Sequence, residues 1–192
     1  MRRRASRETE VKVRLNLDGR GTARVRSGIG FFDHLLETFA KHGALDLEVE
    51  CRGDREVDDH HSVEDVGLTL GEAVREALGK KEGVRRYGFA SVPLDEALAQ
   101  ATVDLSGRPH FTFTGGERLG KAKVGAFDVE LLEDFLGAVA VSAHLTLHLE
   151  VRSGRNLHHI LESCVKACAR ALRAACEPDE RISGVPSTKG RL

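Results

Sequence analysis

The sequence predicts an α/β (α+β) fold built from two copies of one half-domain. Segments that alternate apolar and polar residues, typical of strands with one buried face, are interspersed with segments of helical periodicity. A histidine-rich segment of the first half, Asp59–Asp65 (DHHSVED), returns in the second half as Leu157–Ser163 (LHHILES). Solenoids repeat every 20–50 residues, whereas here the repeat is near 100 residues. We therefore expect a duplicated unit in which sheets pack against helices.

The duplication extends beyond the histidines. Three further pairs of segments align: Leu17–Arg20 with Leu105–Arg108, Phe32–Leu36 with Leu132–Leu136, and Leu45–Gly53 with Leu145–Gly154. We assign residues 1–86 to the first half, 87–176 to the second half and 177–192 to a C-terminal tail.

The first half is predicted to run strand, strand, helix, strand, helix. Thr9–Leu17 carries an apolar residue at every second position and is predicted to be a strand, with Gly21–Arg26 as its hairpin partner. A helix at Gly30–Lys41 and a strand at Leu45–Cys51 follow. The second helix, Asp59–Leu78, has an apolar stripe at helical spacing formed by Val63, Val66, Leu70 and Val74.

The second half is predicted to repeat this order. Its strands are expected at Ala97–Leu105, His110–Thr114 and His144–Arg152, and its helices at Asp128–Ala143 and Leu157–Ala175. The pattern leaves open the conformation of the Gly- and Lys-rich loop at residues 115–125, and the tail has turn residues and no periodicity.

The two histidine clusters predict metal binding. A helix advances about 100° per residue, so His60, His61 and Glu64 fall within one arc of about 100°. The corresponding residues of the second half do the same. Imidazole and carboxylate together form a ligand set for a divalent transition metal. A single such cluster also fits a solvated helix face, but two of them favour metal.

The repeat adds two candidate ligands, because His34 and Asp134 hold equivalent positions on the helix before the third strand. The predicted metal ligands are His34, His60, His61, Glu64, Asp134, His158, His159 and Glu162. This set suffices for two metals that keep open positions for substrate and water. It contains no sulfur and suits Mn, Fe, Co, Ni or Zn, among which ligand type does not choose.

Two further features suggest binding of an anion. Lys166 follows Glu162 by four residues and falls on the same helical arc, so it either balances the carboxylates or holds an anionic substrate. The tail segment Gly184–Gly190 combines hydroxyls, a lysine and glycines, a composition that can bind phosphate. Its other interpretation is a mobile terminus.

Composition excludes several classes. A net charge of -1 over 192 residues gives no electrostatic reason to expect nucleic-acid or membrane binding. No stretch approaches the roughly 18 apolar residues that span a bilayer, and no secretory signal is evident, so we expect a cytoplasmic protein. The four cysteines are interpreted as packing residues, since three of them, Cys164, Cys168 and Cys176, recur at helical spacing.

These motifs together resemble the imidazoleglycerol-phosphate dehydratase family, along essentially the whole chain. The resemblance rests on Leu17–Gly19, Gly30–Leu36, Asp59–Asp65, Asp104–Pro109, Asn156–Glu162 and Pro186–Gly190. It implies a duplicated fold of the ribosomal protein S5 domain 2 type, two manganese ions, and a 24-subunit shell built from trimers. The implied reaction removes water from imidazole glycerol phosphate, giving imidazole acetol phosphate in histidine biosynthesis.

The resemblance also implies roles for individual residues. It carries over the metal ligands named above, except that the family commonly has histidine where this chain has Asp134. We keep Asp134 as a ligand, because carboxylate can replace imidazole at a borderline metal. The implied substrate and phosphate contacts are Arg86, Arg108, Lys166, Ser187 and Lys189, and the implied catalytic carboxylates are Glu8, Glu64 and Glu162. Thr38, where many relatives are expected to have an amide, is a second departure.

Two other functions fit the ligand set. A dinuclear metallohydrolase acting on a phosphorylated small molecule would use the same ligands, but would not need the remote basic residues. A metal-storage protein would saturate its metals with protein ligands, whereas paired histidines beside a lysine favour a site that faces substrate.

Overall fold

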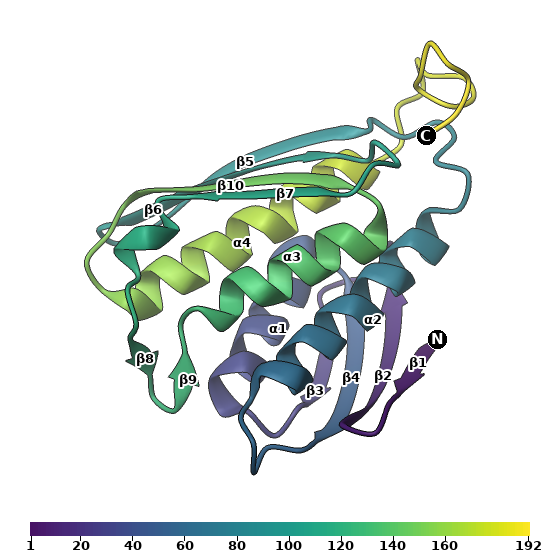
Figure 1. Cartoon of the computed structure of the whole chain (residues 1–192). Coiled ribbons are helices and arrows are strands. Elements are labelled where there is room, and N and C mark those ends of the chain that lie inside the picture. Colours follow the sequence, from purple (N-terminus) through teal and green to yellow (C-terminus); the bar gives the residue numbers. More distant parts are fainter.

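The computed structural model describes all 192 residues, with the side chain of Arg118 left out. Two four-stranded sheets form the outer layers, and four helices lie between them as two inner layers (Figure 1). This is the mixed α/β architecture, with sheets packed against helices, that the sequence predicts.

The first half forms one sheet with the strand order β1-β2-β4-β3. Its elements are β1 (Arg2–Ala5), β2 (Thr9–Asn16), β3 (Ala23–Arg26), α1 (Gly30–Gly43), β4 (Asp46–Gly53) and α2 (His60–Leu78). Strands β1, β2 and β4 pair antiparallel, whereas β3 pairs parallel with β4.

The second half forms the other sheet with the equivalent order, β5-β6-β10-β7. Its main elements are β5 (Tyr87–Leu94), β6 (Ala97–Asp104), β7 (His110–Thr114), α3 (Leu131–Ala143), β10 (Thr146–Ser153) and α4 (Leu157–Cys176). The loop at residues 115–125, whose conformation the sequence left open, contains a short 3-10 helix, η1 (Gly116–Arg118), and the strand β8 (Lys123–Val124), which pairs with β9 (Phe127–Asp128) just beyond the loop.

The ends of the first helix in each half match in detail. Ala44 and His144 cap α1 and α3, and both adopt the left-handed backbone conformation with φ of 51°. The next residue then turns back into the helix: Leu45 N donates to Ala40 O at 2.9 Å, and Leu145 N to Ala140 O at 3.1 Å. This correspondence makes His34 and Asp134 structural equivalents.

One predicted pairing is wrong: the segment at residues 21–26 is not the hairpin partner of β2. β3 instead lies parallel to β4, because both edges of β2 are occupied by β1 and β4. The Asp46 carboxylate reinforces this path, since its Oδ1 accepts the backbone N–H groups of Arg20 at 2.9 Å and Thr22 at 3.2 Å. These two hydrogen bonds hold the loop between β2 and β3 against the first residue of β4.

The core lies between the helices and the inner faces of both sheets. Phe32 of α1 meets Phe135 of α3 edge to face, with ring centroids 5.1 Å apart, and joins the two halves. Cys164 and Cys168 are buried in this core as free thiols, and burial raises the pKa of Cys168 to about 12. They are therefore packing residues, as predicted. No helix in the described part of the chain is long and apolar enough to span a membrane.

Candidate active site

Helix packing across the two halves decides which predicted ligands meet. α1 of the first half packs on α4 of the second, and α2 packs on α3. His34 on α1 therefore faces the His158 cluster on α4, and Asp134 on α3 faces the His60 cluster on α2. Because the two halves are related by an approximate two-fold axis, this packing creates two equivalent sites, and each of them combines residues from both halves.

The first place, here called the Glu162 cluster, consists of His34, His158 and Glu162. Nε2 of His34 and Nε2 of His158 each lie 2.8 Å from the same carboxylate oxygen, Glu162 Oε1. One ligand atom from each residue lies within 4.8 Å of the others. The Phe31 ring lines the cluster, with its centroid 5.0 Å from the His158 ring. Two imidazoles and a carboxylate that converge in this way fit a divalent metal.

Lys166 contacts this cluster from the next helical turn. Its Nζ pairs with Glu162 Oε2, and both side chains are only 13% exposed. Burial raises the pKa of Glu162, but hydrogen bonds from Lys166, His34 and His158 outweigh this effect and lower the pKa to about 2. Glu162 is therefore an ionised carboxylate at neutral pH, with a cation held on its second oxygen.

The second place holds a looser arrangement, here called the His60 pair. Nδ1 of His60 lies 3.3 Å from Oδ2 of Asp134, and both side chains are about two-fifths exposed, at 42% and 41%. The side chain of Glu64, the counterpart of Glu162, is exposed and makes no hydrogen bond or ion pair within the described part of the chain. The first half also lacks a counterpart of Lys166, since Leu68 takes that position.

The second histidine of each cluster is held by a carboxylate that sequence reasoning missed. His61 Nδ1 lies 3.1 Å from Oδ2 of Asp54, and His159 Nδ1 lies 2.8 Å from Oε2 of Glu96. The hydrogen bond with each carboxylate raises the pKa of its histidine. A partner on Nδ1 fixes the ring and leaves Nε2 for a metal, as is usual for metal-binding histidines.

Glu96 has a second function at the start of α4. Its Oε1 accepts the N–H groups of Arg155 at 3.2 Å and Asn156 at 2.8 Å. The hydrogen bond from His159, together with these backbone bonds, lowers the pKa of Glu96 to about 2. The position of Glu96 was available as a signal, because it precedes β6 as Glu8 precedes β2.

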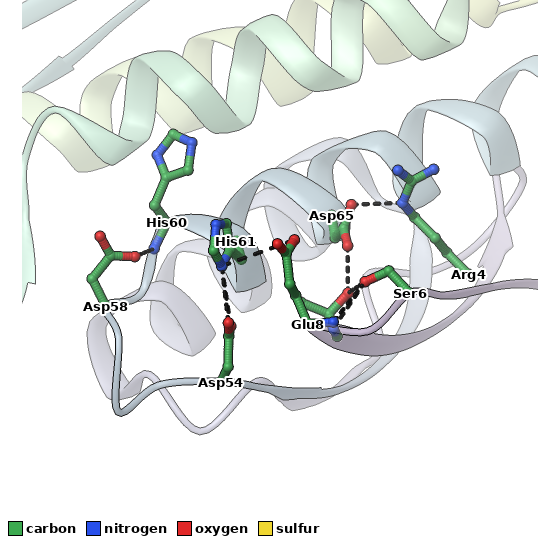
Figure 2. A network of polar contacts seen from close by, with 9 residues as sticks. Arg4, Ser6, Glu8, Asp54, Asp58, His60, His61 and Asp65 are labelled. Carbon is green, nitrogen blue, oxygen red and sulfur yellow. Dashed lines mark hydrogen bonds and ion pairs between the residues drawn. The ribbon is translucent and has the colours of Figure 1, made fainter.

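Glu8 lies beside His61, at the end of the β1–β2 hairpin (Figure 2). Its Oε2 is 4.0 Å from Nδ1 of His61, and its side chain is 55% exposed. The structure therefore brings Glu8 to the histidine cluster of α2, whereas Glu162 lies in the cluster of α4.

Apart from Lys166, the predicted substrate and phosphate residues gather elsewhere, at the C-terminal end of α4. Arg86 binds Asp104 through Nε at 2.8 Å and Nη2 at 3.2 Å, and its Nη1 donates to Pro186 O at 2.8 Å. Arg86 thus holds the tail in place within this chain. Arg108 and Lys189 are exposed, and Lys189 N donates to Ser187 Oγ at 3.2 Å.

The two groups of residues do not meet within one chain. Glu162 is in the second turn of α4, and the tail follows the last residue of that helix, Cys176 (Figure 1). At 1.5 Å per residue, these two positions are about 21 Å apart along the helix axis. Lys166 lies nearer to the metal ligands than to the tail.

Comparison with known proteins decides the family. The family model for imidazoleglycerol-phosphate dehydratase matches residues 27–172. This chain belongs to that family. The imidazoleglycerol-phosphate dehydratase of Geobacillus kaustophilus is 52% identical over 189 residues, which cover 98% of this chain and 96% of that protein. That of Desulforamulus reducens is also 52% identical, with coverage of 98% and 95%.

Solved structures of imidazoleglycerol-phosphate dehydratases share the fold. The Staphylococcus aureus structure matches with a TM-score of 0.81 and 37% identity, covering 92% of this chain and 98% of that chain. The Pyrococcus furiosus structure matches with a TM-score of 0.84 and 35% identity, covering 99% of both chains. As an imidazoleglycerol-phosphate dehydratase family member, the chain is a hydro-lyase of histidine biosynthesis.

Proposed function

We propose that this protein removes water from D-erythro-imidazole glycerol phosphate to give imidazole acetol phosphate, with two divalent metal ions, Mn²⁺, at each active site. The observation that carries the proposal is the Glu162 cluster, where His34 and His158 from different halves meet one carboxylate at 2.8 Å. Residues of this type in this arrangement fit a metal, and family membership supplies the reaction.

The duplicated helices supply the donors for both metals. The residues that would hold them are His34, His60, His61, Glu64, Asp134, His158, His159 and Glu162. When bound, the metals would supply Lewis acidity at the imidazole of the substrate. The sulfur-free set with three carboxylates favours a hard or borderline metal.

The remaining steps fall to side chains of the protein. The carbon-bound proton that leaves is not acidic, since no carbonyl group adjoins it, so a carboxylate must lie within reach of it. Glu8, Glu64 and Glu162 are the candidates. The carboxylates of Glu8 and Glu64 are both exposed and without a hydrogen bond within the described chain, and Glu8 is the one of these two that lies beside a histidine, 4.0 Å from Nδ1 of His61. Lys166, which pairs with Glu162, would lie at the edge of the metal ligands and could also hold a negative charge of the substrate.

The basic residues near the tail would fix the phosphate. Arg108, Ser187 and Lys189 offer a guanidinium, a hydroxyl and an ammonium, which suit a phosphate and would orient the substrate. Arg86 would support them by holding Pro186 O while it binds Asp104.

A complete site then requires more than one copy of the chain. The phosphate residues lie about 21 Å along α4 from Glu162, which is too far for one small substrate to contact both. We therefore propose a homo-oligomer in which neighbouring chains supply the two ends of each site, a 24-mer built from trimers, working in the cytoplasm.

Metal removal tests this proposal. Chelation should abolish water elimination and lower the native mass, and added Mn²⁺ should restore both. The measurements are product formation, inorganic phosphate release, and mass by light scattering with and without chelator. A hydrolase would release phosphate instead. A metal-free protein with unchanged mass would count against metal at the contacts between chains.

A variant of the tail tests the phosphate site. Lys189→Ala should raise KM for the substrate about 10-fold, because one charge-assisted contact to phosphate is lost. Mn²⁺ content and the thermal midpoint should stay unchanged, since Lys189 is exposed and contributes nothing to the core. Lys80→Ala, which removes another exposed lysine two residues after the end of α2, is the control. If the kinetic constants of Lys189→Ala equalled those of the parent, Lys189 would not bind the phosphate, and the tail would be a mobile terminus without a function in binding.

A further inference from the structure

In each half a glutamate directly precedes the second strand of its hairpin, Glu8 before β2 and Glu96 before β6, and the two glutamates make different contacts. Val11 of β2 lies opposite Cys51 of β4, and Ala99 of β6 lies opposite Val151 of β10. Val11 and Ala99 are therefore equivalent in the two sheets. Glu8 lies three residues before Val11, and Glu96 lies three residues before Ala99, so the two glutamates are counterparts. Glu96 binds its histidine, His159, at 2.8 Å, whereas Glu8 stays 4.0 Å from His61.

Asp54 accounts for the difference. Both of its carboxylate oxygens approach His61 Nδ1, Oδ1 at 3.2 Å and Oδ2 at 3.1 Å, so that nitrogen is already occupied. Asp54 directly follows Gly53, and the repeat places Gly154 at the position of Gly53, so the counterpart of Asp54 is Arg155, whose cationic side chain cannot accept a hydrogen bond from His159. In the second half, Glu96 is therefore the carboxylate that binds His159. Asp95 is farther away, with its Oδ2 4.0 Å from Nδ1 of His159 and its side chain 75% exposed.

The backbone of Glu8 is fixed by contacts that do not involve its carboxylate (Figure 2). Its N–H donates to Ser6 Oγ at 3.1 Å, and its carbonyl accepts the N–H of Asp54 at 3.0 Å. The next residue, Thr9, donates its hydroxyl to the buried Asp65 of α2, which also pairs with Arg4 at 2.6 Å. The hairpin is thus anchored to α2 on both sides of Glu8, while the Glu8 side chain points toward His61.

We infer that Asp54 is a positioning residue with two effects: it orients His61 through Nδ1, and by occupying that nitrogen it keeps the Glu8 carboxylate free for proton transfer. The inference rests on the proposed function, in which Glu8 moves a proton. Without Asp54, Glu8 would move onto His61, as Glu96 already lies on His159.

Asp54→Ala in the Mn²⁺-loaded protein tests this division of roles. Glu8 would replace Asp54 on His61, so Mn²⁺ affinity should stay within about threefold of the parent, although losing such a partner usually costs 10–100-fold. At saturating Mn²⁺, kcat should fall about 10²-fold, as in Glu8→Gln, because the proton-transfer group is no longer free. Asp54→Asn, which keeps an acceptor for Nδ1–H, should fall between the parent and Asp54→Ala.

The double variant separates this from a simple structural role. In Glu8→Ala, adding Asp54→Ala should lower kcat no further, while Mn²⁺ affinity, measured by calorimetry, should now fall about 10–100-fold because no acceptor is left for Nδ1 of His61. Glu10→Gln is the matched control, since Glu10 lies two residues from Glu8 with its carboxylate on Arg3.

Two results would overturn the inference, and they differ. If Asp54→Ala alone weakens Mn²⁺ binding and excess Mn²⁺ restores kcat, Asp54 only orients a metal ligand. If Glu8→Gln keeps the parent kcat, the proposed role of Glu8 is wrong, and with it the reason to keep Glu8 free. Metal-dependent water elimination by the parent remains a separate measurement.

Discussion

Replacing Glu162 by glutamine is expected to lower kcat by about 10³-fold, within the range seen for loss of a proton-transfer group. Glu162 joins His34 and His158 through one oxygen and Lys166 through the other, so the amide cannot replace it. A neutral amide binds divalent metal less tightly and cannot accept a proton, and it leaves the Lys166 ammonium without its ion pair. The variant should also lose bound Mn²⁺, measured by elemental analysis after desalting.

The same substitution has a predictable dependence on pH. The pKa of Glu162 is about 2 in the fold, below its ordinary value of 4.5. A depressed pKa means that the ionised carboxylate stabilises the fold above pH 4.5, and that this contribution is lost as the pH falls toward 2. The thermal midpoint of the metal-free parent should therefore exceed that of Glu162→Gln at neutral pH and approach it in acid.

Glu177→Gln is the control, because it removes a carboxylate from the end of the same helix, where Glu177 pairs with Arg85 and Arg173. Its kcat and Mn²⁺ content should match the parent. If Glu162→Gln kept both its metal and its kcat, the Glu162 cluster would be an ordinary polar contact between helices.

The repeat allowed most of the fold to be predicted. The alternation of apolar and polar residues predicted β2, β4, β6 and β10, and the spacing of apolar residues at helical intervals predicted α2 and α4. These patterns exist because each of these elements buries one face against the same core. The edge strands β1 and β5 were missed. β1 is Arg-rich, and β5 contains Pro93 and exposes Tyr87 and Phe89, so neither shows the pattern of a half-buried strand.

The site was predicted in part for a similar reason. Residues spaced by three or four on one helix must share a face, so Glu162 with His158 and Lys166 could be expected to meet. That His34 joins them depends on α1 packing against α4, which the local sequence does not encode. Asp54 and Glu96 come from loops, where no periodicity fixes the direction of a side chain. Only the alignment of Glu96 with Glu8 could have pointed to it.

Asp134 gives the prediction most particular to this chain: Asp134→Ala should lose about one Mn²⁺ per chain, since removal of one of about four protein ligands is severe, and most activity with it. The side chain is 41% exposed, so burial alone does not require a cation partner. The case for a ligand rests on its equivalence to His34 and on His60 at 3.3 Å. Metal content by elemental analysis and kcat at fixed Mn²⁺ are the measurements.

Asp134→His should recover both metal and activity, because imidazole is the group that His34 supplies at the equivalent place and can bind the same metal. With histidine, selectivity should shift from Mn²⁺ toward softer ions such as Zn²⁺, which competition binding would measure. Glu133→Ala is the matched control, since it removes the neighbouring carboxylate from an exposed position on α3. A structure of the Mn²⁺-loaded protein with the Asp134 oxygens more than about 4 Å from any metal would contradict the assignment, because Asp–metal bonds are near 2.0–2.2 Å. In that case Asp134 would act only as the partner of His60, and Asp134→Ala would keep its metal.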